Sequence, residues 1–416
     1  MDRRLLLFAR VWAVLAIALL AASWKLWTPQ TCFPQIPFFE FLISVPGWVD
    51  WIVLSLVGSS LLACLLLKHS AVQPIAPDQA RGWDWFRIAH LLFALAIALL
   101  ILFDQNRLQP WAYHFAIIGL LIGLATPSTA ASLIRWLAIS IYIYSAISKF
   151  DYQFVHTVGE EMLSTMLGFF GIETTDWPSN LTSSLVLLLP AGELLVGIGL
   201  AIPRFRKFAA MAAVGLHLSL LIILGPWGLG HRTGVLLWNL FFIFQALILF
   251  WPQATTETAE AKTDRLAVKS SREKSPRQKV RHLDHLALVL AVLVLAFPLT
   301  QWIGICDHWP AWQVYSPSSS RAQLVNERSF SQWSLEELGV PVYPQSRFQL
   351  AVALAVIEKN SNEQNNRPRS FQIEFRHQSD RVTGNREQEI LSRPDQFKMK
   401  RSEFWVNTRA RKTWFK

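Results

Sequence analysis

Nine apolar runs fill roughly the first 300 residues of the chain, and this pattern limits what it can fold into. The runs are 5–27, 49–67, 87–103, 111–125, 131–148, 183–202, 208–224, 234–251 and 286–302. At about 1.5 Å per residue, a helix of about 20 residues crosses a hydrocarbon core of about 30 Å. The chain is 52% hydrophobic and only 16% charged, a balance that soluble proteins rarely have. We therefore expect an all-α polytopic membrane bundle.

The basic residues between these runs alternate between two sides of the bundle. If the N-terminus is cytoplasmic, 18 lysines and arginines of residues 1–303 belong to the cytoplasmic side and four to the other side. Those four are Lys25, Arg107, Lys149 and Arg232. Lysine and arginine are enriched in cytoplasmic loops. With an odd number of spans, we predict a cytoplasmic N-terminus and an external C-terminus, in a bacterial inner membrane.

Residues 1–303 form the predicted transmembrane domain, which contains two long connections. Residues 253–284 are basic, polar and poor in aromatics, so we predict a disordered cytoplasmic loop. Residues 150–182 form an outer loop in which the stretch 168–171 suggests a re-entrant or interfacial helix. The net charge of +10 comes largely from the cytoplasmic side, where it meets anionic lipid. The expected partner is thus the lipid bilayer rather than a nucleic acid.

The first run leaves two alternatives open. It follows Asp2, Arg3 and Arg4, as the apolar core of a cleaved signal peptide does. Its apolar character continues through Trp24 and Trp27, and this length favours a retained span.

Residues 304–416 have a different composition, polar and without a further span. Residues 350–357 are apolar and fit either a helix or a strand. Residues 370–376 alternate with period two, and a turn signal follows at Thr383, Gly384 and Asn385, so a hairpin is expected. We predict a small α/β or β-rich extracytoplasmic domain.

The three cysteines, Cys32, Cys64 and Cys306, form neither a CxxC nor a zinc-binding spacing, and no other metal motif is present. Cys32 and Cys306 fall on the same predicted side. Whether they pair stays open, because a disulfide depends on a distance that sequence does not give.

Four costly polar side chains occupy consecutive runs at similar depths. Lys149 ends the fifth run, and the sixth, seventh and eighth runs contain Glu193, His217 and Asn239. Counted from the outer ends, they lie within about 15 Å of the surface. Ionisable groups in a membrane usually face the interior of a bundle or mark a functional site. We therefore predict that these four residues line one polar pocket in the outer half of the membrane.

Lys149 is the candidate catalytic base or anion holder, and Glu193 and His217 could share protons with it. Further candidate substrate-binding residues near the same side are Tyr142, Tyr144, Asn239, Trp227, His231 and Arg232. The alternative is that the buried polar groups only hold helices together and that Lys149 reaches to the interface. His90 and His114 are lone histidines on apolar runs and are assigned to packing.

Several short motifs together resemble a known family. They are residues 142–150 ending in Lys149 and Phe150, the triplet 192–194, the basic turn 203–207 and the central His217. This order is similar to the horizontally transferred transmembrane (HTTM) domain family, which includes vitamin K-dependent γ-carboxylase-like proteins. It is also similar to the smaller DoxX and MauE-like membrane proteins. In the carboxylase-like enzymes a membrane lysine deprotonates a reduced quinone, and by position the resemblance assigns that role to Lys149.

The resemblance leads to two functional hypotheses. The first is a membrane enzyme, carboxylase-like or quinone-linked, acting on a quinone or another lipid-soluble substrate. The tail is much shorter than the carboxylase's outer region, so peptide γ-carboxylation is not expected. The second is a non-enzymatic, DoxX/MauE-like redox-associated or scaffold protein whose outer domain binds an extracytoplasmic protein partner. Whether the chain is an enzyme stays open at this point.

Overall fold

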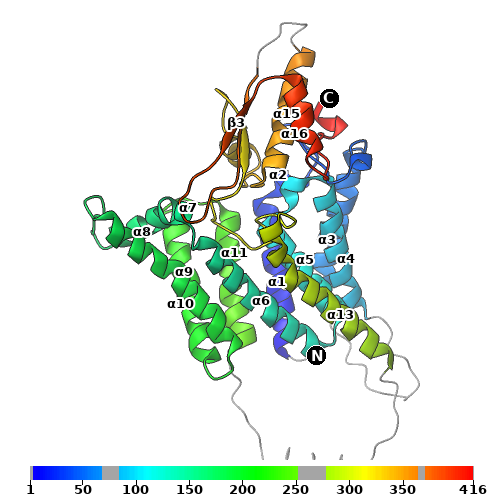
Figure 1. Cartoon of the computed structure of the whole chain (residues 1–416). Coiled ribbons are helices and arrows are strands. Elements are labelled where there is room, and N and C mark those ends of the chain that lie inside the picture. The colour runs from blue at the N-terminus through cyan, green and yellow to red at the C-terminus, as the bar shows by residue number, and fades with distance from the viewer. Residues whose placement is uncertain (1–2, 68–83, 252–277, 364–370, 416) are drawn as a thin grey trace, which may run out of the picture.

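The computed structural model describes residues 3–67, 84–251, 278–363 and 371–415. Long helices form a bundle, and a smaller domain of strands and helices is stacked on one end of it (Figure 1). The two ends of the chain lie far apart, the N-terminus at the free end of the bundle and the C-terminus in the small domain (Figure 1). Most of predicted loop 253–284 falls in 252–277, outside the described residues.

Each of the nine predicted runs is helical. The helices are α1 (Arg3–Ala22), α3 (Trp48–Leu66), α4 (Trp85–Phe103), α5 (Pro110–Leu124), α6 (Pro127–Lys149), α9 (Ser179–Ala201), α10 (Arg206–Leu224), α11 (Thr233–Gln245) and α13 (Gln278–Ala296). The π-helix η3 (Ala246–Phe250) extends α11, and the 3-10 helix η5 (Phe297–Ile303) extends α13. A short α2 (Trp24–Trp27) follows α1, so the first predicted run is broken at Ser23. Because α13 begins at Gln278, the end of the predicted basic loop is helical.

Eight of these helical segments are long and apolar enough to cross a membrane. The exception is α5, whose 15 residues reach only about 22 Å. Proline begins both α5 and α6, at Pro110 and Pro127, where its missing N–H leaves no helical bond unmade. Consecutive helices pack side by side, as α3 and α4, α4 and α5, and α9 and α10 do. The long apolar helices suggest an integral membrane protein.

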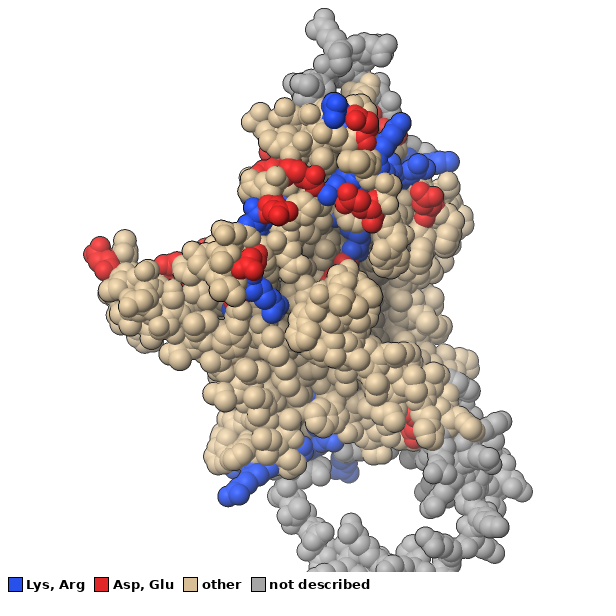
Figure 2. Space-filling model, viewed as in Figure 1, with Lys and Arg blue, Asp and Glu red and all other residues tan. Residues whose placement is uncertain are grey.

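Charged residues avoid the middle of the bundle. On the face that Figure 2 shows, the helices present a broad uncharged band, with Lys and Arg and some acidic atoms at the free end and mixed charges near the small domain. Arg206 and Lys207 begin α10 at the free end. This is the distribution that the alternation of basic residues in the sequence predicts.

The small domain contains an antiparallel sheet and several helices. The elements are β1 (Arg321–Leu324), α14 (Phe330–Glu337), α15 (Ser346–Glu363), β2 (Ile373–Arg376), β3 (Gln388–Leu391), α16 (Pro394–Ser402) and η6 (Lys412–Phe415). The strand order is β1-β2-β3, and α15 packs on β1 and β2. The apolar run 350–357 therefore belongs to a helix. The predicted hairpin is present, with Gly384 at φ +70° in its connection.

One hydrophobic core continues from the bundle into the small domain. Phe33, in the connection after α2, packs against Trp333 of α14 with ring centroids 4.7 Å apart. Tyr113 of α5 packs on Trp312 at 5.1 Å. Near the C-terminus, the Asn407 N–H donates to the Phe38 carbonyl at 3.1 Å. The small domain is thus built onto the end of the bundle rather than tethered by a linker.

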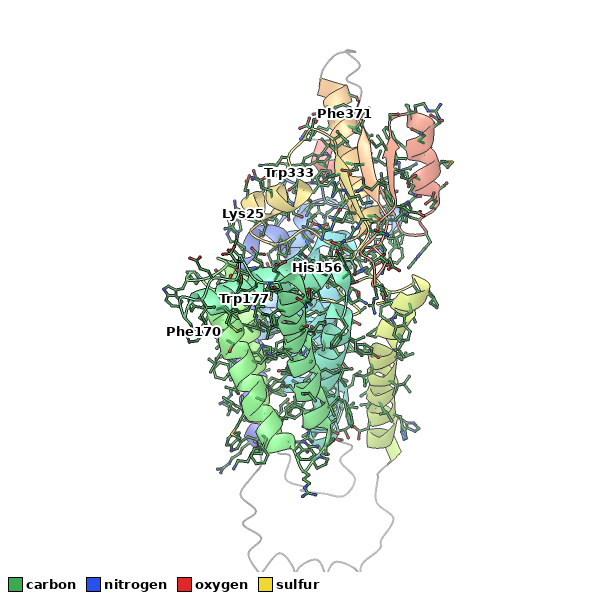
Figure 3. All side chains as sticks on the ribbon, turned by 60° about the vertical axis from the view of Figure 1, so that its left-hand side comes forward. Lys25, His156, Phe170, Trp177, Trp333 and Phe371 are labelled. Carbon is green, nitrogen blue, oxygen red and sulfur yellow. The ribbon has the colours of Figure 1, made fainter. Side chains whose placement is uncertain are left out.

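The outer loop 150–182 holds α7 (Tyr152–Val155) and α8 (Val158–Gly168). Residues 168–171, where we expected a helix, instead end α8 in a turn, with Gly171 at φ +71°. Figure 1 shows α8 projecting sideways from the bundle at the end that carries the small domain. Phe170 and Trp177, which follow α8 in the chain, lie at the edge of this projection. They are at the same end of the bundle as Lys25 and His156 (Figure 3).

None of the three cysteines forms a disulfide. The Cys32 thiol lies 3.2 Å from the Gln30 side-chain oxygen, and the Cys306 thiol 3.4 Å from the Asp307 carbonyl. Cys64 is buried in α3, with its sulfur 3.4 Å from Nδ1 of His90.

Candidate functional site

A cavity of about 430 Å³ lies where the helices meet the small domain. Its walls come from α6, α8, α9, α10 and α11 and from the ends of α1, α5 and α7, and Trp309, Val314, Tyr315 and residues 339–341 of the small domain close it on one side. The lining is mostly apolar. Its polar members are Ser23, Gln109, Tyr142, Ser145, Lys149, Glu193, His217, Ser219, His231, Arg232, Asn239 and Tyr315. A cavity with apolar walls and a few convergent polar groups is typical of a small-molecule site.

Helix α6 supplies three of the polar groups from one face. Tyr142, Ser145 and Lys149 are spaced by three and four residues, so their side chains project from the same side of the helix. All three are buried. The face continues to the last residue of the helix, which places the lysine at the rim of the apolar bundle.

Lys149 forms an ion pair with Glu193 of α9. The Nζ–Oε2 distance is 2.6 Å, and the two side chains are 11% and 16% exposed. The ammonium also donates to Oγ of Ser145 at 2.7 Å. An ammonium has three protons to donate, so one is left for a ligand. Pro190, inside α9 one turn before Glu193, removes a backbone bond from the helix at this depth.

A second network joins α6 to two other helices, α10 and α11. Asn239 donates from Nδ2 to the Val235 carbonyl at 2.9 Å, which turns its Oδ1 towards His217. Nδ1 of His217 therefore donates to this oxygen at 2.8 Å. Nε2 is then the acceptor for the Tyr142 hydroxyl at 2.7 Å. The imidazole stacks on Phe242 with centroids 4.7 Å apart. With this assignment of donors and acceptors the imidazole carries one proton, and the Tyr142 oxygen can still accept a bond from a ligand.

Two further predicted residues lie at the edge of the cavity beside the small domain. His231 packs edge-on against Tyr315 with ring centroids 5.7 Å apart. Burial lowers the pKa of His231, and the Glu161 carboxylate partly opposes this. Arg232 also lines the cavity and is exposed. This edge is therefore the more polar and accessible end.

Two candidate residues do not belong to the cavity. The Tyr144 hydroxyl points the other way and donates to the Leu295 carbonyl at 2.8 Å. Two positions along a helix correspond to a rotation of about 200°, so Tyr142 and Tyr144 cannot share a face. Trp227 is 81% exposed and does not line the cavity.

Several cavity residues were not predicted from the sequence. One of them, Ser145, could have been found, because it lies one helical turn before Lys149. Trp309, Val314 and Tyr315 come from the small domain, and no local pattern links them to α6 or α10. His90 and His114 lie outside the cavity in the packed core, where His114 accepts from Nε1 of Trp238 at 3.2 Å.

Among the described residues, no group of three or more His, Cys, Asp or Glu side chains is arranged to hold a metal ion. The chain matches no family model, no curated protein and no solved structure.

Proposed function

We propose that the chain is a nine-span integral membrane protein with a cytoplasmic N-terminus and an extracytoplasmic small domain. The geometry of α5 supports the ninth crossing: α4 ends and α6 begins at opposite ends of the bundle, with α5 between them. A short helix can cross where it is covered by protein, and most of α5 is buried. The basic residues at the free end support the orientation.

A reporter fused after Lys416 tests this orientation. We expect a reporter that works only outside the cytoplasm to be active there, because basic residues hold the free end of the bundle inside. The same reporter inserted within residues 262–277 should be inactive, since η3, the last element before this basic stretch of sequence, ends at the free end of the bundle. Activity of a cytoplasmic reporter after Lys416 would contradict this orientation and indicate the opposite one.

The cavity, in this proposal, binds a lipid-soluble molecule with a small polar head. The observation that carries it is the meeting of the Lys149–Glu193 pair and the Tyr142–His217–Asn239 network in one mostly apolar cavity. The apolar walls fit a hydrocarbon body. The unused ammonium proton can be donated to a carbonyl or hydroxyl oxygen, and the Tyr142 oxygen can accept from a hydroxyl group. Quinones and their reduced forms have this chemistry, and they reach such a site through the membrane.

Lys149 is the proposed base for a reduced quinone, in the role that the HTTM-family resemblance implies. An ammonium cannot accept a proton, so it must first pass one on. The Glu193 carboxylate, 2.6 Å away, is placed to take that proton. The free amine can then remove the hydroxyl proton of the bound molecule, and the resulting oxyanion accepts a hydrogen bond from the ammonium of Lys149 that this step forms. The neutral His217 holds Tyr142 in position.

Lipid retention tests the proposal. The protein is purified in mild detergent, and bound lipids are extracted and identified by mass spectrometry. We expect the wild type to retain a quinone-class molecule, and Lys149→Met and Tyr142→Phe to lose at least about tenfold of it, because each removes a hydrogen bond in a dry site. Tyr144→Phe is the matched control, since its hydroxyl lies outside the cavity.

Equal retention by all three variants would contradict the assignment of the cavity. An empty cavity together with stoichiometric capture of one soluble protein by the small domain would instead favour the non-enzymatic scaffold. A different retained lipid would keep the site and change the substrate class.

A further inference from the structure

The small domain places two arginines directly opposite each other on neighbouring strands. Arg321 of β1 pairs in register with Arg376 of β2. Like charges in this position destabilise a sheet. Arg376 is compensated, because its guanidinium donates to both oxygens of Glu374 at 2.8 and 2.9 Å. In the part of the chain that the structure describes, Arg321 has no such carboxylate partner.

Two more arginines reach the same place from the connection between β2 and β3. Arg386 donates to the carbonyls of Ser319 and Pro317, both at 2.9 Å, and so lies over the start of β1. Burial and the positive charges of Arg321 and Arg376 lower the pKa of the Arg386 guanidinium, and the Asp151 carboxylate partly opposes this. Arg381 lies in the same connection. Neither Arg381 nor Arg386 forms an ion pair with a carboxylate of the described residues.

Three acids of the described residues lie nearby, Asp380, Asp151 and Glu387, and Glu387 lines the same surface pocket as Arg386. One oxygen of Asp380 accepts from the backbone and side chain of its own turn, at Val382 and Thr383. Asp151 caps the first turn of α7, and its charge also acts on Arg381 and Arg386. In the arginine cluster, Arg321, Arg376, Arg381 and Arg386, Glu374 therefore pairs with Arg376 and Asp151 partly balances two members, whereas Arg321 forms no ion pair with a carboxylate of the described residues.

Buried hydrogen-bonding groups without partners lie beside the cluster. The hydroxyls of Ser319 and Ser379 and Nε2 of His308 are buried and make no hydrogen bond in the described residues. Ser379 and Arg386 line one open surface pocket, together with the acids Asp380 and Glu387. His308 is neutral, because burial lowers its pKa to about 4; Asp307 opposes this, and Arg381, Arg321 and Arg386 add to it. Nδ1 of His308 faces the Gln345 amide nitrogen, so Nε2 carries the proton and is a donor.

The cluster also lies next to the bundle. The Arg381 carbonyl accepts from the Tyr152 N–H at 2.8 Å, and the Gly384 carbonyl accepts from the Gln153 side chain at 2.8 Å. Both contacts are at the start of α7, directly after α6 ends at Lys149. Val382, at the tip of the connection, is 82% exposed. The arginines are thus held at the level where the apolar band of the bundle ends.

We propose that the arginine cluster is a binding site for a phosphate group, carried by the head group of an anionic phospholipid or by a soluble phosphate. Guanidinium groups bind phosphate oxygens in bidentate fashion, and neutral hydroxyl and imidazole donors complete such a site. A bound phosphate removes the repulsion between Arg321 and its neighbours and gives partners to the buried donors. This site is separate from the cavity and does not depend on its ligand.

The experiment compares wild type with the double variant Arg321→Gln/Arg381→Gln. Neither side chain makes a hydrogen bond in the described residues, so the exchange leaves the fold intact. Full-length protein in neutral detergent is titrated with inorganic phosphate, and the binding of phosphate is measured. A titration with chloride at equal ionic strength is the reference. In parallel, melting temperatures are measured in phosphatidylcholine nanodiscs with and without phosphatidylglycerol. Arg328→Gln is the control, because Arg328 pairs with Glu336 on the same domain away from the cluster.

We expect the double variant to bind at least about tenfold more weakly than wild type and the control, from the loss of charge-assisted hydrogen bonds. Without any anion it should melt at the same or a higher temperature than wild type. A response to inorganic phosphate alone identifies a soluble source, and one to phosphatidylglycerol alone identifies the lipid head group. Equal responses of wild type and double variant, no response in either arm, or a double variant that does not fold would overturn the proposal. Phosphate stabilises many proteins by exclusion, and this comparison removes that effect.

Discussion

Replacing Arg411 by alanine should lower the free energy of unfolding by about 3–5 kcal/mol, the usual cost of breaking a buried ion pair from one side. The Arg411 guanidinium and the Asp50 carboxylate are both fully buried and lie 2.8 Å apart. Arg107 contacts the same carboxylate at 2.6 Å and is also fully buried. Removing Arg411 leaves part of this carboxylate without a partner in a medium where water cannot replace it.

The ion pair joins parts of the chain that are far apart in sequence. Asp50 is in the first turn of α3, whereas Arg411 lies near the C-terminus and also donates to the Val45 carbonyl at 2.9 Å. Asp104, buried nearby, adds a second acid, and its burial raises its pKa to about 6 although Arg107 and Arg411 oppose the shift. The cluster therefore fastens the end of the small domain to the bundle.

Arg409→Ala is the matched control, two residues from Arg411. Arg409 is 61% exposed and lies 4.0 Å from the Glu40 carboxylate, which is 71% exposed, so its loss should cost little. Unfolding in detergent can be followed by circular dichroism, and limited proteolysis reports release of the small domain. Equal stability of the Arg409 and Arg411 variants would mean that the buried cluster does not hold the two parts together.

The bundle was predictable from sequence because a helix in lipid satisfies its own backbone hydrogen bonds. Each apolar run therefore contains most of the information needed to form its helix. What failed was local detail: the break at Ser23, the start of α13 at Gln278 and the turn that ends α8 at Gly168. Mixed polar and apolar residues at the interface fit a helix, a turn or a loop about equally well.

The candidate site was predictable in part, for an energetic reason. Lys149, Glu193, His217 and Asn239 are each costly in lipid, and a shared cavity lowers that cost for all four. The contribution of the small domain was not predictable, because Trp309 and Tyr315 reach the cavity only through the folded chain. The contact of Arg411 with Asp50 is equally non-local. The Cys32–Cys306 question needed the three-dimensional structure too.

Replacing two glycines of α5 is the second change for which we expect a large effect on the free energy of unfolding. Gly119 and Gly123 are four residues apart and so face α4 from one side of the helix. A Cβ on Gly119 would lie 3.0 Å from the His90 carbonyl oxygen, 3.3 Å from the Phe93 ring and 3.4 Å from Trp12. A Cβ on Gly123 would lie 2.4 Å from Cγ of Leu91. Small residues at this spacing let two helices approach closely in a membrane.

Gly119→Val/Gly123→Val should lower the free energy of unfolding by about 3 kcal/mol or more, because overpacking forces α4 and α5 apart. The leucine side chain can move away from Gly123, but the His90 carbonyl belongs to a helix backbone and cannot. Gly215→Val in α10 is the control, since a Cβ there meets nothing within 4 Å. It carries the same change in helix propensity for each substitution. If unfolding in detergent shows the same loss per substitution for the double variant and for Gly215→Val, the loss comes from the backbone, and the close contact of α4 with α5 has no energetic role.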